Sequence, residues 1–458
     1  MDDQQPDMPI EQITPDLEEA AKVVLEMNLC GEYTAPTNIG LYPHQWLWDS
    51  CFTAIGLRHY DIERAKIELS SLLRGQWSNG MLPNMILSQD KNARDGNIWR
   101  SWINPNAPEG VHTSGITQPP MLAEAIVRVG ERMKAPERRS WYKHMYEPLL
   151  AYHQWLYADR DPHNEGLLLQ IHPWETGLDN TPPWMSRIRE HNMPLWIKTA
   201  EKLKLAPLLN TFRRDTKFIS AEERMDTIDA LSLYSAQRRL RRKGYDTQRV
   251  ISGAHFTIED VSFNSIFIRA NQHLAAIAKY IRRELPEDFV QRTKQTELVL
   301  EALWDPYSSQ YYSREFTTHQ LIKIPTIGTL MPLYAGTISK ERAQALVKQL
   351  ENEHRFGATY PIPTVPLDNE WFDPQRYWQG PTWINTNWLI IDGLRRYGFD
   401  NHADALTEAT LDLVRLSGFY EYFSPIDGKP SGAQNFSWTA ALTIDLLHTA
   451  GIKPETTT

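Results

Sequence analysis

The sequence predicts an all-α protein, folded as one large helical domain with long loops at one end. Apolar residues recur at three- and four-residue steps in about a dozen segments, which is the spacing of one helical face. Several connecting segments are long and rich in Trp, Gly, Pro and Asn. No composition break, Ser/Gly linker or repeat of fixed period divides the 458 residues. We therefore expect a single domain over 1–458, with 1–13 as a loosely ordered leading segment.

The helical pattern is clear in 61–75, where Ile62, Ala65, Leu69 and Leu72 form one apolar stripe. Proline residues that follow such stripes act as stop signals for the helices. The other predicted helices lie at 14–29, 46–59, 116–133, 135–158, 184–208, 222–242, 261–283, 286–303, 338–353, 382–397, 401–416 and 432–450.

Four of the connecting segments are unusually long for a compact domain, and loops of this length usually carry function. They are 76–115, 159–183, 305–326 and 355–381. A short strand is predicted at 419–423, and the turn residues of 425–430 follow it directly. We therefore expect a short β-hairpin near 418–430.

The composition fits either an aromatic-rich core or a site for a sugar, and the positions of the aromatic residues must decide between them. The chain holds 16 Trp, 19 Tyr and 14 Phe, and many of them lie beside acids and amides in the sequence. Flat aromatic faces stack on sugar rings while polar neighbours bind the hydroxyls. The net charge of −9 makes nucleic acid or an anionic membrane an unfavourable partner. The basic cluster at 238–243 is interpreted as the solvated C-terminus of a helix.

Several classes of protein lack their motifs here. The sequence contains no phosphate-binding glycine loop, no HExxH or paired CxxC, and no GxSxG elbow. We expect no cofactor and no metal. Cys30 and Cys51 are too few for a disulfide framework, the first residues do not resemble a leader, and no apolar run could span a bilayer. We expect a soluble, cytoplasmic protein; its oligomeric state is left open.

The first candidate motif is GLYPHQWLWDS at 40–50. Two indoles precede Asp49, which could bind two ring hydroxyls of a sugar that rests on the indoles. The structural alternative is that Asp49 only caps the helix that starts here.

The second motif is HPWETGLDNTPPW at 172–184, which carries Glu175 and Asp179. Two carboxylates in a loop of Trp, Pro and His have little structural purpose. A carboxyl among aromatic faces is partly desolvated, which raises its pKa and suits it to act as a general acid on a glycosidic oxygen. The alternative is an N-cap for the helix that begins near Trp184.

The third and fourth motifs lie toward the C-terminus. RYWQGPTWINTNW at 376–388 places Trp383 and Trp388 five residues apart, so that at least one can face a cavity. In the predicted hairpin, aromatic residues flank Glu421, which as a general base would hold a water on the ring face opposite the acid.

These four stretches, in this order, resemble family 63 of the glycoside hydrolases, and within it the bacterial mannosylglycerate and glucosylglycerate hydrolases. The resemblance runs from about 35 to 450. It rests on WLWDS (46–50), HPWETGLDN (172–180), RYWQGPTWINTNW (376–388) and EYFSP with GxxxFSWTAA (421–441).

The resemblance implies an (α/α)6 barrel with its active site at one mouth. It implies an inverting, exo-acting α-glycosidase for a small α-glucoside or α-mannoside, with Asp179 as general acid, Glu421 as general base and Asp49 holding the terminal sugar. Arg213 and, as the preferred candidate, Arg214 could bind the carboxylate of glycerate, because guanidinium groups pair well with carboxylates. The implied substrate contacts are Tyr42, Trp46, Trp48, Gln118, Trp174, Tyr377, Trp383 and Gln434.

Three other functions remain open at this stage. A trehalase-like hydrolase could use the same barrel, although the glycine-rich PGGRF stretch typical of trehalases is missing. A sugar-binding protein without catalytic activity could reuse the fold. An α/α toroid of isoprenoid chemistry is disfavoured, because the sequence has no DDxxD or DxDD element.

Overall fold

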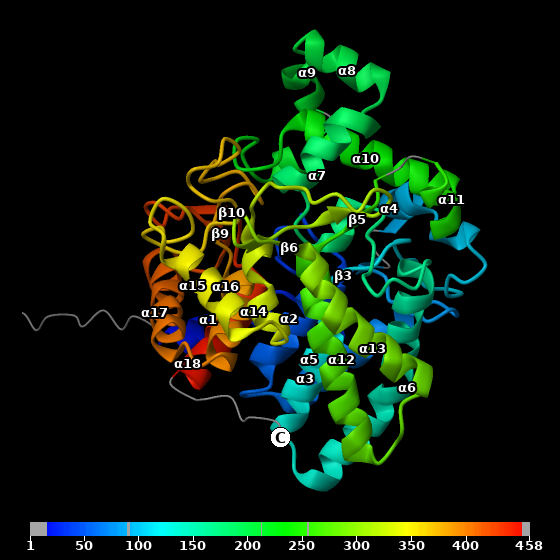
Figure 1. Ribbon diagram of the computed structural model, residues 1–458, viewed down its shortest axis with the longest axis vertical. Coiled ribbons are helices and arrows are strands. Elements are labelled where there is room, and N and C mark those ends of the chain that lie inside the picture. Colours follow the sequence, from blue (N-terminus) through cyan, green and yellow to red (C-terminus); the bar gives the residue numbers. More distant parts are fainter. Residues whose placement is uncertain (1–15, 89–91, 212, 254–255, 451–458) are drawn as a thin grey trace, which may run out of the picture.

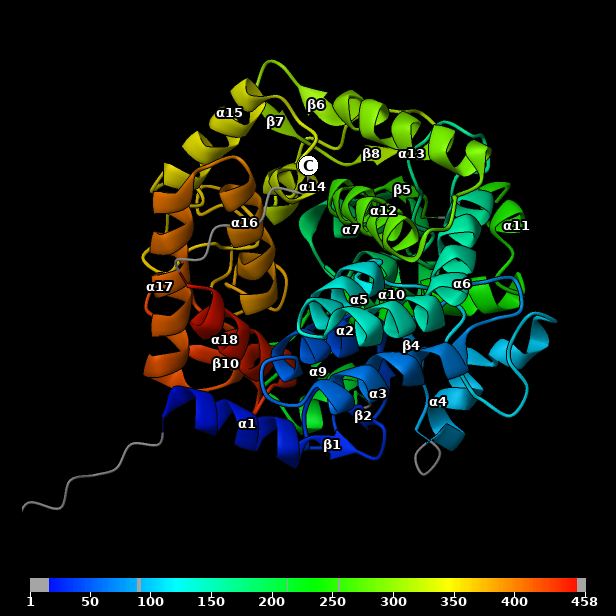
Figure 2. The ribbon, with the colours of Figure 1, turned by 90° about the horizontal axis from the view of Figure 1, so that it is seen from below.

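The computed structural model describes residues 16–88, 92–211, 213–253 and 256–450, so the predicted leading segment 1–13 lies outside the described residues. Within these ranges, six inner helices form a closed ring in which each contacts the next (Figure 2). They are α2 (Leu47–Leu57), α5 (Leu122–Glu131), α12 (Val261–Ile281), α14 (Pro332–Ala335), α16 (Ile384–Arg396) and α18 (Ser437–Thr449).

A second layer of helices surrounds the ring, and the chain alternates between the two layers (Figure 2). The first outer helix packs on α18, so the N-terminal and C-terminal parts of the described chain close the barrel. The predicted all-α class and the (α/α)6 barrel are confirmed. The outer helices are α1 (Leu17–Met27), α3 (Ile62–Leu72), α6 (Ala135–Arg160), α13 (Glu287–Val299), α15 (Lys340–Glu351) and α17 (Asp400–Ser417).

Burial explains which helices form which layer. Every residue of α2 from Leu47 to Leu57 is buried, as is α16 from Ile384 to Leu394. Outer helices such as α17 bury only a stripe, as their periodicity predicts. The inner helices approach closely: a Cβ at Gly56 of α2 would lie 2.4 Å from the carbonyl oxygen of Ala441 in α18.

The predicted helix 184–208 is wrong as a single element, because prolines interrupt it. It divides into α7 (Pro182–Arg187), a π-helical turn (Ile188–Asn192), α8 (Leu195–Lys202) and α9 (Ala206–Asn210). Pro194 stands as the N-cap of α8, and Pro207 lies in the first turn of α9, where a missing N–H is tolerated. Figure 1 shows α8 and α9 projecting beyond the ring at the top of the view.

Other helices differ from the sequence expectation in detail. The predicted helix 222–242 begins later, as α10 (Thr227–Arg242), because the Asp226 carboxylate caps it by accepting a hydrogen bond from the N–H of Ile228. The basic cluster lies in its last turn, as expected. Sequence periodicity missed three short helices of the described chain: α4 (Asn92–Trp99) inside the predicted loop 76–115, α11 (Thr247–Ile251) and the inner helix α14. The 3₁₀ segments are Leu73–Gly75, Ser101–Ile103, Pro173–Thr176, Asp215–Lys217, Leu300–Leu303 and Ile327–Leu330.

The predicted β-hairpin is confirmed as β9 (Tyr420–Phe423) paired antiparallel with β10 (Pro430–Gln434). Four more two-stranded pairs occur among the described residues: β1 (Leu29–Cys30) with β2 (Tyr33–Thr34), β3 (Gln45–Trp46) with β4 (Met85–Ile86), β5 (Ile258–Glu259) with β8 (Arg314–Glu315), and β6 (Trp304–Asp305) with β7 (Gln310–Tyr311). No helix in the described ranges is long and apolar enough to cross a membrane.

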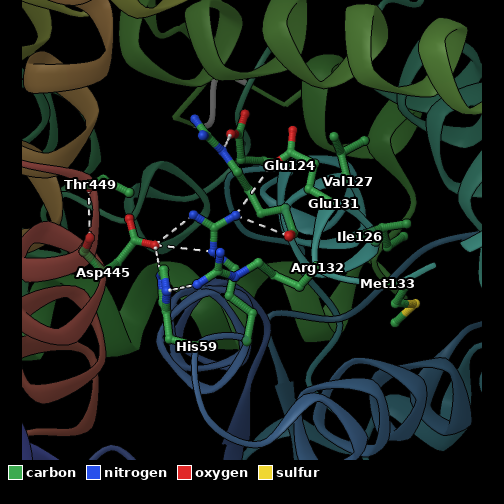
Figure 3. A network of polar contacts seen from close by, with 12 residues as sticks. His59, Glu124, Ile126, Val127, Glu131, Arg132, Met133, Asp445 and Thr449 are labelled. Atoms are coloured by element: carbon green, nitrogen blue, oxygen red, sulfur yellow. Dashed lines mark hydrogen bonds and ion pairs between the residues drawn. The ribbon is translucent and has the colours of Figure 1, made fainter. Parts of the chain in front are cut away.

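A buried ionic network joins the inner helices near their C-terminal ends (Figure 3). The Asp445 carboxylate of α18 accepts hydrogen bonds from Arg58 Nη2 at 2.9 Å and from Trp388 Nε1 at 2.8 Å, and it contacts His59 Nε2 at 2.7 Å. Arg58 Nη1 also donates to Glu131 at 3.2 Å. Burial alone would raise the pKa of Asp445, but the Arg58 charge and the His59 hydrogen bond hold it below its ordinary value.

A second carboxylate extends the network across the ring. Glu124 of α5 accepts from Tyr334 of α14 at 2.7 Å and contacts His273 of α12. Arg128 donates to Glu124 and to Asp392 of α16, both at 2.7 Å. With Asp445, these pairs link all six inner helices through one connected set of charged and polar groups.

We predict that Asp445→Asn lowers the free energy of unfolding by about 3–5 kcal/mol, because it removes the buried counter-charge of Arg58 and leaves only the half-exposed Glu131. Urea unfolding at pH 7 measures the change. Asp404→Asn is the matched control: it breaks an exposed 2.9 Å pair with Arg395 and should change stability by less than about 1 kcal/mol. Equal effects of the two substitutions would contradict the role assigned to the network.

Candidate active site

A cavity of about 230 Å³ lies where several inner helices begin. Asp49 lies in the first turn of α2, Gln118 just before α5, Tyr377 before α16 and Trp438 in the first turn of α18. The structure therefore brings together residues from distant parts of the chain. The predicted site residues that line the cavity are Tyr42, Trp46, Trp48, Asp49, Gln118, Trp174, Asp179, Arg214, Tyr377 and Glu421.

Asp49 is buried, with 6% of its surface exposed. It does not cap α2, because the N-cap residue is Trp46 and no side chain caps that end. Burial raises the pKa of Asp49 well above its ordinary value, and the nearby charges of Glu421 and Asp179 raise it further. A buried carboxyl with no capping task is available to bind hydroxyl groups of a ligand.

Asp179 faces the same cavity and accepts a 3.1 Å hydrogen bond from the Tyr377 hydroxyl. The N-cap of the following helix α7 is Thr181, so the capping alternative for Asp179 does not apply. Burial raises the pKa of Asp179 to about 7, although Tyr377 and the charge of Arg224 act in the opposite direction. Near neutral pH this carboxyl can therefore hold a proton and release it.

Glu421 reaches the cavity from the first strand of the hairpin and is 2% exposed. Its Oε1 accepts a hydrogen bond from the Tyr42 hydroxyl at 3.0 Å. Its Oε2 accepts from the Ala433 N–H at 3.0 Å and from Arg224 Nη1 at 3.2 Å. The two carboxyls thus have different partners: a hydroxyl for Asp179, and a cation with two further donors for Glu421.

Arg224 is a site residue that sequence reasoning missed. The residue is 4% exposed, its guanidinium lies 4.1 Å from the centre of the Tyr377 ring, and it donates to the Tyr42 hydroxyl at 2.6 Å. It therefore connects the surroundings of Glu421 to those of Asp179. No sequence signal marked it, because it lies in a polar segment before α10, outside the four motifs.

Ten Trp, Tyr and Phe side chains line the cavity. Gly177 has φ of +73°, and a Cβ there would lie 2.5 Å from the Trp48 ring, so this turn can approach the indole only as glycine. The indole N–H groups of Trp46 and Trp438 are buried without a partner in the described part of the chain. Ring faces beside carboxyls and unused N–H donors are the surroundings that a sugar ring requires.

One side of the cavity is closed by a polar cluster. Arg214 Nη2 donates to the Gly40 carbonyl at 2.9 Å, and Nη1 lies 3.3 Å from the Asp95 carboxylate. His44 Nδ1 accepts from the Ser88 N–H, so its Nε2 carries the proton that faces Asp95 at 2.8 Å. The neighbouring candidate Arg213 does not line the cavity, because it binds Asp215 and the Met225 carbonyl instead.

Two predicted contacts do not reach the cavity. Trp383 is fully buried behind the wall, where it stacks on Trp378 with ring centres 3.7 Å apart and donates to the Tyr377 carbonyl at 3.0 Å. Gln434 is exposed, because the register of the hairpin shifts between Ser431 and Gln434 and turns this side chain outward. Both predictions are therefore corrected.

Two further expectations from the motifs are wrong, because the residues concerned belong to the core. Neither Trp383 nor Trp388 faces the cavity, since Trp388 donates to Asp445 inside the barrel. Glu175 does have a structural purpose, since it accepts hydrogen bonds from Arg160 Nη2 at 2.6 Å, the Ile171 N–H at 2.8 Å and the Thr117 N–H at 3.3 Å. Glu175 thereby holds the loop that presents Asp179.

No group of three or more His, Cys, Asp or Glu side chains converges as a metal site within the described ranges. Cys30 is exposed and Cys51 is buried, and both are free thiols. The chemistry of the cavity therefore comes from carboxyl, hydroxyl, amide, guanidinium and indole groups of the chain.

An (α/α)6 barrel with paired carboxyls in an aromatic cavity at one mouth defines the class, a glycoside hydrolase. The family model of the mannosylglycerate hydrolase MGH1-like glycoside hydrolase domain matches residues 42–439. The chain belongs to this family, within family 63 of the glycoside hydrolases.

Individual relatives agree over nearly the whole chain. A mannosylglycerate hydrolase from Rubrobacter radiotolerans is 36% identical over 94% of this chain and 97% of its own length. A glucosylglycerate hydrolase from Mycolicibacterium hassiacum is 30% identical over 93% of this chain and 96% of its own. The crystal structure of a mannosylglycerate hydrolase from Thermus thermophilus with Tris and D-glycerate matches with a TM-score of 0.83 and 36% identity, covering 94% of this chain and all of the other.

We predict that Asp179→Asn raises the free energy of unfolding at pH 8 by about 2–4 kcal/mol. A folded-state pKa above the unfolded one means that stability falls as pH rises from about 4 toward 7, because the folded protein binds this proton more tightly. Asparagine removes that loss, and the difference from the parent should vanish near pH 4. Urea unfolding at both pH values tests this, with the exposed Asp368→Asn as control. A gain that is independent of pH would contradict the prediction.

Proposed function

We propose that this glycoside hydrolase is an inverting, exo-acting α-glycosidase that hydrolyses mannosylglycerate or glucosylglycerate. The observation that carries the proposal is that two carboxyls with different surroundings, Asp179 and Glu421, line one small cavity together with Asp49. The names of the most similar relatives support glycosylglycerates as the substrate class. A cytoplasmic location is part of the proposal and fits the two free thiols.

Asp179 is the proposed general acid. A carboxyl that protonates a leaving oxygen must carry its proton at the working pH, and burial provides this by raising the pKa of Asp179 to about 7. The Tyr377 hydroxyl at 3.1 Å orients the carboxyl and stabilises the anion that proton transfer leaves behind.

Glu421 is the proposed general base. Tyr42, Arg224 and the Ala433 N–H stabilise its carboxylate as an acceptor, so that one lone pair can take a proton from an attacking water. Attack by a water that Glu421 holds on the face opposite Asp179 inverts the anomeric centre. This mechanism requires the two carboxyl groups to lie about 6.5–9.5 Å apart across the bound sugar.

Asp49 and the indoles are proposed to hold the terminal sugar. The volume of about 230 Å³ lies below the roughly 300–1,000 Å³ of sites for drug-sized ligands, so one sugar ring and a small aglycone fit better than a polymer. The Asp49 carboxyl can bind two hydroxyls, and Trp46 and Trp48 line the same space.

Arg214 is proposed to bind the carboxylate of glycerate. It is the arginine at the cavity that is not engaged with Glu421, and its partner Asp95 also has His44 as a donor. Substrate carboxylate could therefore take over Arg214 while His44 keeps Asp95 in place. The solved Thermus relative was crystallised with D-glycerate, which is consistent with an anionic aglycone.

We expect the protein to release sugar from mannosylglycerate or glucosylglycerate, and less or none from trehalose, sucrose and kojibiose. Asp179→Asn and Glu421→Gln should each lower kcat about 10²–10⁴-fold, because each removes one partner of the acid–base pair. The exposed Glu190→Gln is the control. Absence of sugar release from all five compounds would refute the proposal and favour a sugar-binding protein. Full activity in either variant would refute the role assigned to the substituted carboxyl.

The stereochemical outcome is a separate prediction. Proton NMR recorded in the first minutes of hydrolysis of an α-linked substrate should show the β-anomer of the released sugar before mutarotation, because water attacks from the opposite face. An initial α-anomer would contradict inversion and leave hydrolysis itself untouched.

We predict that Arg214→Gln raises KM for a glycosylglycerate about tenfold or more, since charge-assisted hydrogen bonds contribute about 1.5–3 kcal/mol. KM for a glycoside with a neutral aglycone should change less than about threefold. The exposed Lys217→Gln serves as the matched control. Equal increases for both substrates would show that Arg214 does not bind the carboxylate.

A further inference from the structure

A second cavity, of about 480 Å³, lies on the other side of the aromatic wall of the active site. It is enclosed by the C-terminal end of α6, the start of α11, and the loops that follow α3 and the 3₁₀ segment Ser101–Ile103. None of its lining residues lines the active-site cavity, and one of them, Arg160, supports the Asp179 loop through Glu175. Its volume is about twice that of the active-site cavity.

The lining combines rings, amides and cations. Trp77, Trp155 and Tyr245 contribute aromatic surface, and Asn79 and Asn106 contribute amide groups. Each of these amides uses its oxygen: Asn79 accepts from the Met81 N–H and Asn106 accepts from the Ser78 hydroxyl. Their amide N–H groups have no partner within the described chain. Rings beside free amide donors form the same kind of surface as in the active site and suit a saccharide.

The charged side chains that line this cavity differ from those of the active site. Lys243 and Arg249 have no ion-pair or side-chain hydrogen-bond partner among the described residues. Of the two carboxylates in the lining, Asp159 binds Arg160 and Thr247, whereas Asp246 caps α11 by accepting from the Arg249 N–H and keeps its charge. The lining therefore carries three cations against two anions, and this excess favours a ligand with negative charge.

The cavity is also anchored to the active site. Tyr245 packs 6.4 Å from Trp77 on its own side and 6.4 Å from Trp99, which lines the active-site cavity. Trp99 in turn packs 5.9 Å from Trp174. On the floor, Arg160 lies over Trp155 and holds Glu175, next to Trp174. Ligand bound here would rest against the reverse side of the substrate-binding wall.

We propose that this second cavity is an accessory binding site for an anionic saccharide, recognised by its ring through Trp77, Trp155 and Tyr245 and by its charge through Lys243 and Arg249. A carboxylate and a phosphate offer the same charged oxygens to these two side chains. The inference stands independently of which glycoside the enzyme hydrolyses.

Titration calorimetry of the whole protein with glucuronate, glucose 6-phosphate and methyl α-glucoside tests the proposal. At least one anion should bind saturably and more weakly at high salt, and the two anions together show whether carboxylate or phosphate is preferred. The neutral glucoside should bind at least tenfold more weakly at this site. No saturable binding of either anion, or equal binding of the neutral sugar, would overturn the proposal.

The variants separate this cavity from the active site. Lys243→Ala/Arg249→Ala should weaken anion binding about tenfold or more, while sugar hydrolysis stays unchanged. The exposed Arg242→Ala, from the same helix end but outside the cavity, should bind like the parent. Ala158→Phe, which fills the cavity from an exposed position of α6, should abolish binding, whereas Ala276→Phe on α12 should not. Anion binding that survives both cavity variants would place the ligand elsewhere and refute the site.

Discussion

Closure of the inner ring is the constraint on which the rest of the structure depends. Six helices can face one another around a common axis only if their inward polar groups find partners inside the barrel. Asp445 and Glu124 supply these partners, because each accepts from several side chains on neighbouring helices. The glycine at 56 allows α2 and α18 to approach so closely that the ring closes without a gap.

The closed ring determines where chemistry can occur. Ion pairs among Arg58, Glu131 and Asp445 lie near the C-terminal ends of three inner helices, and the active-site cavity lies where several inner helices begin. At that end the chain buries three carboxyls in one small cavity, and the burial of Asp49 and Asp179 opposes folding at neutral pH because their charged forms would be better solvated in water. Arg224 gives the Glu421 carboxylate a cationic partner, and the burial of Asp179 is what makes this carboxyl able to carry a proton.

The long loops at the mouth of the barrel are held in place by buried polar contacts. Glu175 accepts hydrogen bonds from Arg160 and from two backbone N–H groups, and these bonds fix the loop of Trp, Pro and Gly that carries Asp179. The same Arg160 forms the floor of the second cavity. One buried ion pair thus lies between the substrate-binding wall and the proposed anion site, so the two cavities share a structural element.

Local pattern was sufficient for most of the architecture. Helical periodicity located the six outer helices and five of the six inner ones, because helices in a two-layer barrel bury one face or all faces and so repeat apolar residues regularly. It missed α14, which at four residues is too short to show a repeat. Eight of the twelve predicted site residues lie in the four motifs and line the cavity, including Asp49, Asp179 and Glu421. Gln118 and Arg214 line it from outside the motifs. Tertiary structure alone decided what remained. Arg224 joined the site because a polar segment folds back over Glu421, Trp383 left it because a neighbouring indole stacks in front, and a register shift turned Gln434 outward. Such outcomes depend on contacts between residues far apart in the chain, which a pattern of near neighbours does not contain.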